Sequence, residues 1–240
     1  MSHRKTLIVV SHYSLRPKSI LQELINSLID NRYDIVVVIN NDDVDSVSHD
    51  IFCPGVVSIN RPNTGMNIGA WDCAFREFPD YKYYIFLQDE CVIKNFSFIE
   101  AYIARLSDVN IGVIGESINT KWNKDWILIS NSVLNYVVGL NNLGNKVGRV
   151  EFYLYMMKKW GIEPGVTGRH LRALVWALRG DVLLKINGFP IGISKEECIA
   201  AEIAVSKSVE QLGLRVEQVD VDAFQYIRHS EWRNDGSSKI

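Results

Sequence analysis

The sequence predicts an α/β domain with a mostly parallel central sheet flanked by helices. Short runs such as Thr6–Ser11 and Asp34–Asn40 are apolar at nearly every position, as expected for strands buried on both faces. Amphipathic segments with helical spacing separate these runs, so strands and helices alternate along the chain. A length of 240 residues fits a single domain of this kind.

The elements follow one another regularly up to Leu87. The apolar positions Ile20, Leu21, Leu24 and Ile25 have the 3–4 spacing of a helix with one buried face. The expected elements are a strand at Thr6–Ser11, a helix at Ser19–Asp30, strands at Asp34–Asn40 and Val56–Ile59, a helix at Asn67–Phe78 and a strand at Tyr83–Leu87.

The second half is less regular. The expected elements there are a strand at Ile111–Ile114, helices at Val150–Trp160 and Glu196–Leu212, and a strand at Arg215–Val221. Gly161 and Gly213 follow the two helices, where glycine commonly ends a helix. Residues 234–240 are small and polar, and we expect a frayed tail there.

Composition excludes several classes of protein. Hydrophobic residues make up 47% and charged residues 22% of the chain, which is ordinary for a folded domain, and the formal net charge of -2 argues against a nucleic-acid binder. No apolar run approaches the roughly 18 residues of a membrane span, and the N-terminal run Leu7–Val10 is too short for a signal peptide. We therefore expect a cytoplasmic protein, at most peripherally associated with the inner face of the membrane. The cysteines form no CxxC pair, which favours reduced thiols.

The strand at Tyr83–Leu87 ends abruptly in Gln88-Asp89-Glu90. In open α/β sheets, ligands bind beyond the carboxyl ends of the strands. Two carboxylates at such a place are unfavourable unless they hold a cation or take part in chemistry. The alternative is a solvated acidic turn.

This triplet resembles the Asp-x-Asp or Glu-Asp-Asp motif of GT-A glycosyltransferases, and the chain is similar to a divergent, family-2-like member of that fold. The resemblance implies a GT-A domain with Mn²⁺ or Mg²⁺ held by Glu90 and Asp89, and by His229 as a third ligand. The alternative for His229 is an ordinary surface group or a core group with other partners. Gln88 takes the place of the first carboxylate. A neutral amide there would hydrogen-bond a ribose or a metal-bound water.

A second segment is similar to the Asn-x-Gly-x-x-x-Ala pattern of the same family. Asn63 and Gly65 match it, and Gly69-Ala70 match one residue later than the usual spacing. Gly65 permits a tight turn, and the small pair lets a helix approach closely. The resemblance implies that this turn meets the nucleotide, with Arg61 beside a phosphate. The alternative is a plain turn that begins a helix.

The ends of the first two strands complete the nucleotide-sugar site that the resemblance implies. Ser11 and His12 end the first strand, with His12 a candidate for contact with the base. Asn40 ends the second strand, and Asp42 or Asp43 would bind the uracil or ribose.

Glu202 is the candidate catalytic base. It shares an apolar stripe of its helix with Cys198 and Val205, and a carboxylate in such a stripe is unfavourable unless it lines a site. In the resembled family a Glu-Asp pair precedes a helix end by about a dozen residues, and Ala201-Glu202 occupies that place. Glu196 and Glu197 form a rival pair, for which charge at a helix start is the favoured interpretation.

Three further features are candidates for contact with the acceptor or with a sugar. Asn187-Gly188-Phe189 is similar to a Gly-Gly-Phe-like turn beside the acceptor site. His170 lies in a basic cluster and meets either an acceptor phosphate or, as the favoured alternative, solvent at a helix start. Trp122, Trp126, Trp160 and Trp176 include candidates for sugar stacking, although core packing is the safer interpretation.

The resemblance implies a glycosyltransferase that transfers a hexose-type sugar from a nucleotide-diphosphate donor to a hydroxyl acceptor, with inversion. Residues 1–95 would bind the donor, and residues 96–233 the acceptor, a glycan or lipid-linked glycan of surface polysaccharide assembly. One alternative is a non-catalytic domain that binds a nucleotide or glycan. The other is a nucleotidyltransferase, which the lack of a Gly-rich, Lys-bearing loop near the first strand disfavours.

Overall fold

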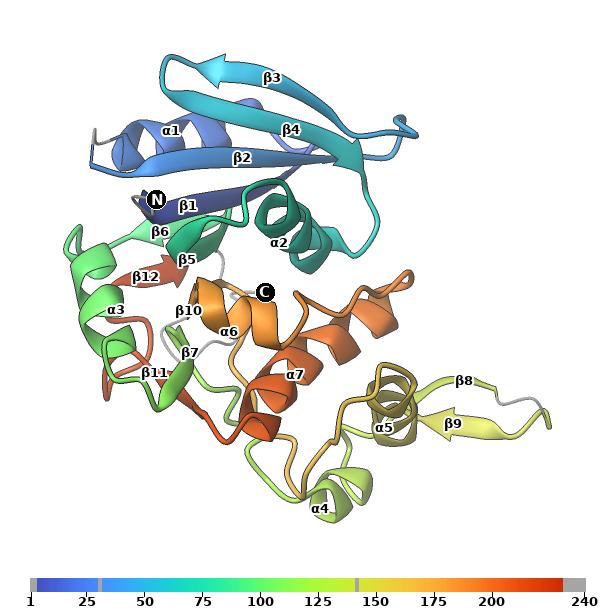
Figure 1. The fold of residues 1–240 in the computed structure, drawn as a ribbon. Helices are drawn as coiled ribbons and strands as arrows, with labels where there is room; N and C mark the ends of the chain where they lie inside the picture. Colours follow the sequence, from blue (N-terminus) through green and yellow to red (C-terminus); the bar gives the residue numbers. More distant parts are fainter. Residues whose placement is uncertain (1–3, 30–31, 141–142, 231–240) are drawn as a thin grey trace.

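A computed structural model describes residues 4–29, 32–140 and 143–230. Its central sheet has eight strands in the order β11-β7-β10-β5-β1-β2-β4-β3 (Figure 1). The strands of this sheet are β1 (Arg4–Tyr13), β2 (Asp34–Asn41), β3 (Ser48–Cys53), β4 (Val56–Pro62), β5 (Tyr81–Gln88), β7 (Ile111–Gly115), β10 (Val175–Arg179) and β11 (Arg215–Gln218).

The sheet is mostly parallel, as the sequence predicts. β1 pairs in parallel with both β2 and β5, β2 with β4, and β7 with β11. β10 is antiparallel to β5 and β7, and β3 is antiparallel to β4. The chain runs outward from β1 through β2 to β4 and then returns to β5 on the other side of β1. The strand order therefore changes direction between β1 and β5, and α/β sheets bind ligands at the carboxyl ends of strands at such a point.

Helices cover both faces of the sheet. They are α1 (Lys18–Leu28), α2 (Met66–Glu77), α3 (Phe98–Leu106), α4 (Trp126–Ser130), α5 (Arg149–Lys159), α6 (Gly180–Lys185) and α7 (Lys195–Gln211). Alternate residues of β1 enter different cores: Ile8 and Val10 pack with α1 and α3, whereas Leu7 and Val9 pack with α2, α6 and α7. This alternation explains why the strand is apolar throughout.

A third core lies under α4, α5 and α7. Trp122, Trp126 and Tyr153 pack there against Ile203. Figure 1 shows α4, α5 and the hairpin of β8 (Val137–Leu140) and β9 (Lys146–Gly148) beside α7, away from the β3 edge of the sheet. Trp122 and Trp126 are buried, as is Trp176 in the sheet, and Trp160 is half-buried against these cores, so core packing accounts for these tryptophans.

The predicted elements are present with small shifts at their ends. The expected helix at Ser19–Asp30 begins at Lys18 and ends at Leu28, and the expected strand at Arg215–Val221 ends at Gln218. Asp30 and the expected tail 234–240 lie outside the described residues. The sequence does not predict the two-stranded sheet of β6 (Cys91–Ile93) and β12 (Ile227–His229), which pairs His229 with Cys91.

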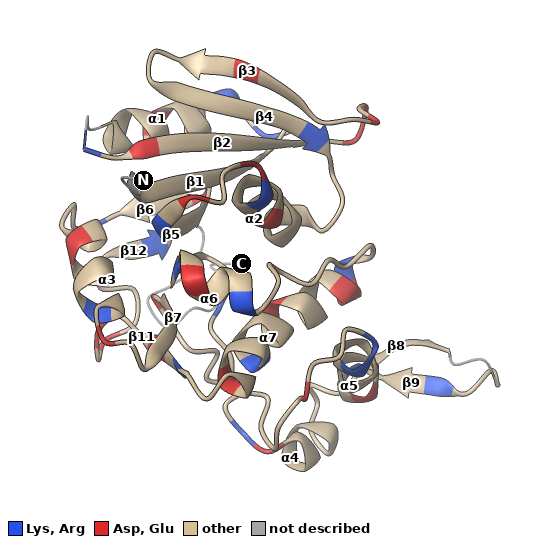
Figure 2. Cartoon of the chain, in the orientation of Figure 1, with Lys and Arg blue, Asp and Glu red and all other residues tan. Residues whose placement is uncertain are grey.

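The cysteines and the helix lengths bear on two expectations drawn from the composition. The four cysteines are all free thiols, as expected. Among the described residues, no helix is both long and apolar enough to cross a membrane. Figure 2 shows acidic and basic residues interspersed over the described elements, in keeping with the near-neutral net charge.

Candidate functional site

The acidic pair sits in a tight turn between β5 and β6. The backbone N–H of Asp89 donates to Ser11 O at 3.0 Å, which anchors the turn to the end of β1. Asp89 is only 3% exposed. Its Oδ2 lies 2.6 Å from His12 Nδ1, which is the donor because a carboxylate only accepts. Its other oxygen, Oδ1, accepts from Arg16 Nη1 at 3.0 Å.

Glu90 shares this arginine. Its Oε2 lies 2.6 Å from Arg16 Nη1 and 3.1 Å from His229 Nε2. The β6–β12 pairing brings His229 to this place from the far end of the described chain. Burial acts to raise the pKa of Glu90, but hydrogen bonds from His229 and Arg16 outweigh it and hold the pKa below its ordinary value.

The predicted metal ligands Glu90, Asp89 and His229 are therefore neighbours, but their arrangement does not fit a divalent ion. Arg16 Nη1 contacts an oxygen of each carboxylate and fills the position between them. Over the part of the chain that the structure describes, no three His, Cys, Asp or Glu side chains are placed to hold a metal together. A metal at this pair requires Arg16 to move away.

The position of His12 differs from the one expected beside a nucleotide base. Its ring is 1% exposed and faces Asp89, so it is closed off from a base in this arrangement. The physical reason is the alternation of β1, which turns His12 away from Ser11 and toward the acidic turn. Ser11 itself donates to Asn67 Oδ1 at 3.0 Å and so ties β1 to the start of α2.

Polar side chains meet at the ends of β1, β2 and β4. Asp42 accepts a hydrogen bond from Tyr13 Oη and another from Asn63 Nδ2, the latter at 3.0 Å. These bonds lower the pKa of Asp42, with the bond from Tyr13 as the larger cause. Sequence reasoning identified Asp42 and Asn63 but missed Tyr13, whose one signal is its place directly after His12. The group is exposed or half-buried and open to a ligand.

Asn40 and Arg61 form the support beneath this group. Arg61 Nη1 donates to Asn40 Oδ1 at 2.6 Å, and Nη2 donates to Thr64 O at 2.7 Å. Arg61 is buried, so in this arrangement it shapes the turn, and its expected contact with a phosphate stays a prediction. Gly65 has a φ of 79°, and a Cβ on Gly69 would lie 2.0 Å from Thr64 O. The two glycines are thus required for the turn and the close helix start, as predicted.

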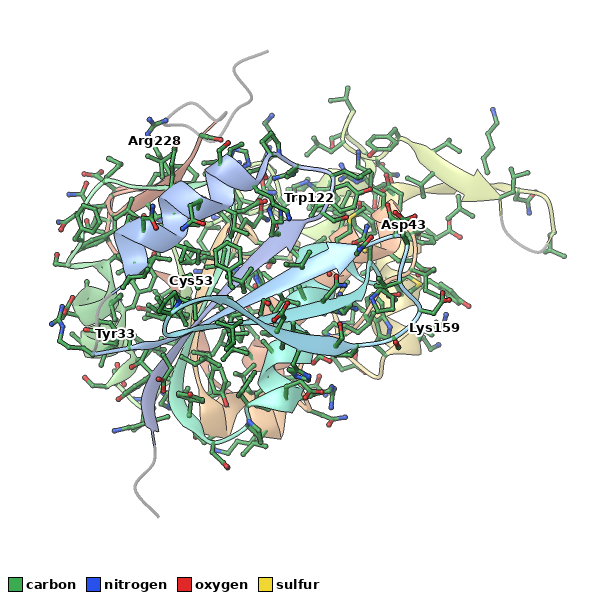
Figure 3. The ribbon with its side chains drawn as sticks, turned by 90° about the horizontal axis from the view of Figure 1, so that it is seen from above. Tyr33, Asp43, Cys53, Trp122, Lys159 and Arg228 are labelled. Atoms are coloured by element: carbon green, nitrogen blue, oxygen red, sulfur yellow. The ribbon has the colours of Figure 1, made fainter. Side chains whose placement is uncertain are left out.

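Gln88 connects the acidic turn to the predicted base. Its Nε2 donates to Ala173 O, and the N–H of Ala173 donates to Glu202 Oε1 at 2.9 Å. One backbone residue therefore separates the end of β5 from a carboxylate on α7. Viewed from above, Asp43 lies toward one end of the sheet and Tyr33 toward the other (Figure 3).

Glu202 lines a cavity of about 210 Å³. Trp122, Arg149, His170 and Arg172 are among the other lining residues. Burial raises the pKa of Glu202, and the hydrogen bond from Ala173 opposes the shift only in part. The side chain keeps 23% exposure toward the cavity, so a ligand can reach it.

The sequence suggested that His170 lies at a solvated helix start, but the structure buries it. Its Nδ1 donates to Gly168 O at 2.7 Å, and its Nε2 lies 3.3 Å from the amide of Asn119. Burial lowers its pKa to about 4, so the ring is neutral at physiological pH. The neutral ring lies 3.9 Å from Glu202, and Arg172 and Arg149 are the nearby cations that favour the charged form of the carboxylate.

The remaining expectations concern the chain around α7. Glu196 and Glu197 lie in its first turn, where Ser194 accepts from the Glu197 N–H at 3.2 Å, as the helix-start interpretation requires. Asn187 and Gly188 both have positive φ. Gly188 packs close to Asp72, which accepts from Phe189 N–H at 2.8 Å and fixes this turn on α2.

Comparison with known proteins gives a likeness of fold. Neither a protein family model nor a curated protein sequence matches this chain. Among solved structures, the chain is similar to the mannosyltransferase PcManGT from Pyrobaculum calidifontis, in complex with GDP-Man and Mn²⁺. The TM-score is 0.53 at 11% identity, over 89% of this chain and 54% of that one, so the chain spans about half the length of this neighbour. The chain therefore shares the α/β fold of this mannosyltransferase over most of its own length.

Proposed function

We propose that this protein is a glycosyltransferase that moves a sugar from a nucleoside-diphosphate donor to a hydroxyl acceptor. The observation behind the proposal is the link from Gln88 through Ala173 to Glu202. It puts a carboxylate of raised pKa next to the sheet edge where α/β proteins bind nucleotides. The fold shared with a mannosyltransferase supports the same assignment.

In this mechanism Asp42, Asn63 and Tyr13 bind the nucleoside part of the donor at the ends of β1, β2 and β4. The sugar extends toward the cavity of Glu202. Glu202 accepts the proton of the acceptor hydroxyl, and the hydroxyl oxygen bonds to the anomeric carbon. The bond from that carbon to the diphosphate oxygen breaks on the opposite face, which gives inversion. The acceptor, as a glycan or lipid-linked glycan in surface polysaccharide assembly, follows from the family resemblance.

Mn²⁺ or Mg²⁺ is the cofactor that the family resemblance implies. It would supply a positive charge on the leaving diphosphate. Because Arg16 lies between Asp89 and Glu90, the proposed transfer does not depend on a metal ion at this pair.

Nucleotide binding is the direct test of the donor site. We expect UDP or GDP to raise the melting temperature of the protein, because a ligand that binds the folded state stabilises it. Asp42→Asn should weaken this shift, whereas Asp45→Asn, an exposed position in the same loop, should leave it unchanged. Release of nucleoside diphosphate from a sugar nucleotide then separates an enzyme from a non-catalytic binding domain. If no nucleotide stabilises the protein, the proposed donor site is wrong.

A further inference from the structure

Arg16 is placed as a cation for both carboxylates of the acidic turn. It lies in the loop between Tyr13, the last residue of β1, and Lys18, the first residue of α1. A single nitrogen, Nη1, is 3.0 Å from Asp89 Oδ1 and 2.6 Å from Glu90 Oε2. Nη1 of a guanidinium has two hydrogens, so each carboxylate receives one. This is the bridging position that a metal ion would take.

The acidic pair needs a positive charge. Asp89 is buried and Glu90 nearly so, and two adjacent carboxylates removed from water are strongly unfavourable unless a cation neutralises them. Arg16 supplies this charge, because it contacts both carboxylates and an arginine side chain stays protonated in proteins.

The rest of the guanidinium is available to a ligand. Neither Nε nor Nη2 of Arg16 has a hydrogen-bond partner among the described residues. The side chain is 37% exposed, so these three N–H donors reach solvent. Guanidinium groups bind phosphate oxygens with paired, parallel hydrogen bonds. Arg16 can thus hold the protein carboxylates with one nitrogen and an anion with the other two.

We propose that Arg16 replaces the divalent cation in this protein: it links Asp89 and Glu90 to the diphosphate of the donor, so donor binding needs no added metal. The identity of the anion rests on the proposed function. The position of Arg16 on the acidic pair does not. The two parts therefore have separate tests.

The first test is a Mn²⁺ titration followed by electron paramagnetic resonance. Wild-type protein should bind Mn²⁺ weakly, because Arg16 occupies the pair. Arg16→Met should bind Mn²⁺ at least roughly tenfold more tightly than wild type, because the two carboxylates lose the positive charge beside them. Adding Glu90→Gln to that variant should abolish the gain. Arg32→Met, which removes an exposed arginine from Glu100, is the matched control and should behave as wild type.

The second test is calorimetric titration with GDP and UDP in EDTA or in Mn²⁺. Wild-type affinity should be the same in both, and Arg16→Met should lose about tenfold in EDTA, the loss of one charge-assisted contact. If circular dichroism shows that Arg16→Met is unfolded, Arg16→Lys keeps a charge but not the paired donors, and should lose nucleotide affinity without gaining Mn²⁺.

Two outcomes would overturn the inference: wild-type protein that binds Mn²⁺ as tightly as Arg16→Met, or nucleotide binding that occurs only with Mn²⁺. A different result bears on the proposed function alone. If neither nucleotide binds under either condition, that function fails, while the Mn²⁺ titration still decides whether Arg16 holds the cation position.

Discussion

The acidic turn and the Glu202 cavity hold carboxylates of opposite character. Glu90 receives hydrogen bonds from Arg16 and His229, which lower its pKa despite burial. Glu202 receives one backbone N–H and stands beside a neutral His170, and burial raises its pKa. Carboxylates whose surroundings push their pKa values apart serve different purposes. The turn holds fixed charge, whereas Glu202 is suited to exchange a proton.

Glu116 shows that a raised pKa alone does not mark a base. Burial raises its pKa too, against hydrogen bonds from Tyr102 and from the backbone of Tyr226. It is 1% exposed, however, and enclosed by these partners. Glu202 differs because it faces a cavity, and access is what makes its proton affinity useful.

The largest expected effect is on turnover. Glu202→Gln should lower the transfer rate about 10²- to 10⁴-fold, the usual contribution of a general base, with nucleotide affinity unchanged. Glu151→Gln, an exposed position on α5, is the control and should keep full activity. The rate of the wild type should also rise with pH through the raised pKa of Glu202, above the ordinary glutamate value. Full turnover in Glu202→Gln would remove this residue from the mechanism.

The next effect is on stability and separates the two carboxylate sites. Asp89→Asn should lower the free energy of unfolding by about 3 kcal/mol, because it breaks a buried charge cluster and leaves His12 and Arg16 without their carboxylate. Glu202→Gln should leave stability equal or higher, since it removes a charge that burial disfavours. Urea denaturation of both variants measures this. Equal losses in the two would show that the sites are not electrostatically different.

The strands and helices could be predicted from the sequence because their signals are local. The β-branched run of β2 and the periodic stripe of α7 predict their own structure within a few residues. Gly65 and Gly69 likewise belong to one turn, so a short motif contains the whole requirement. Glu202 stood out because a carboxylate interrupts an apolar stripe, and the structure places it in a cavity.

The parts that the sequence did not predict depend on distant contacts. Arg16 precedes a proline in a loop with no periodic pattern, and its partner Asp89 is 73 residues away. His12 and His170 looked like candidates for solvent or ligand, yet the fold buries both. β6 and β12 have three residues each, too few for a pattern, and their pairing alone brings His229 to Glu90.

The smallest effect is the pH dependence of stability, where the two sites should differ in sign. Glu90 has a lowered pKa in the folded state, so its stabilisation is present above the ordinary glutamate pKa and is lost as pH falls through the folded value. Glu202 has a raised pKa, so its contribution is fully present below the ordinary value and is lost as pH rises through the folded value.

Comparing wild type with Glu90→Gln and Glu202→Gln across acidic pH tests this difference directly. The advantage of wild type over Glu90→Gln, about 1 kcal/mol near neutral pH for a partly exposed hydrogen-bonded group, should shrink as the solution becomes more acidic. The free energy of unfolding of Glu202→Gln, relative to that of wild type, should instead increase as pH rises. If the advantage of wild type over Glu90→Gln instead falls as pH rises, burial dominates at both carboxylates, and the hydrogen bonds of Arg16 and His229 do not compensate for it at Glu90.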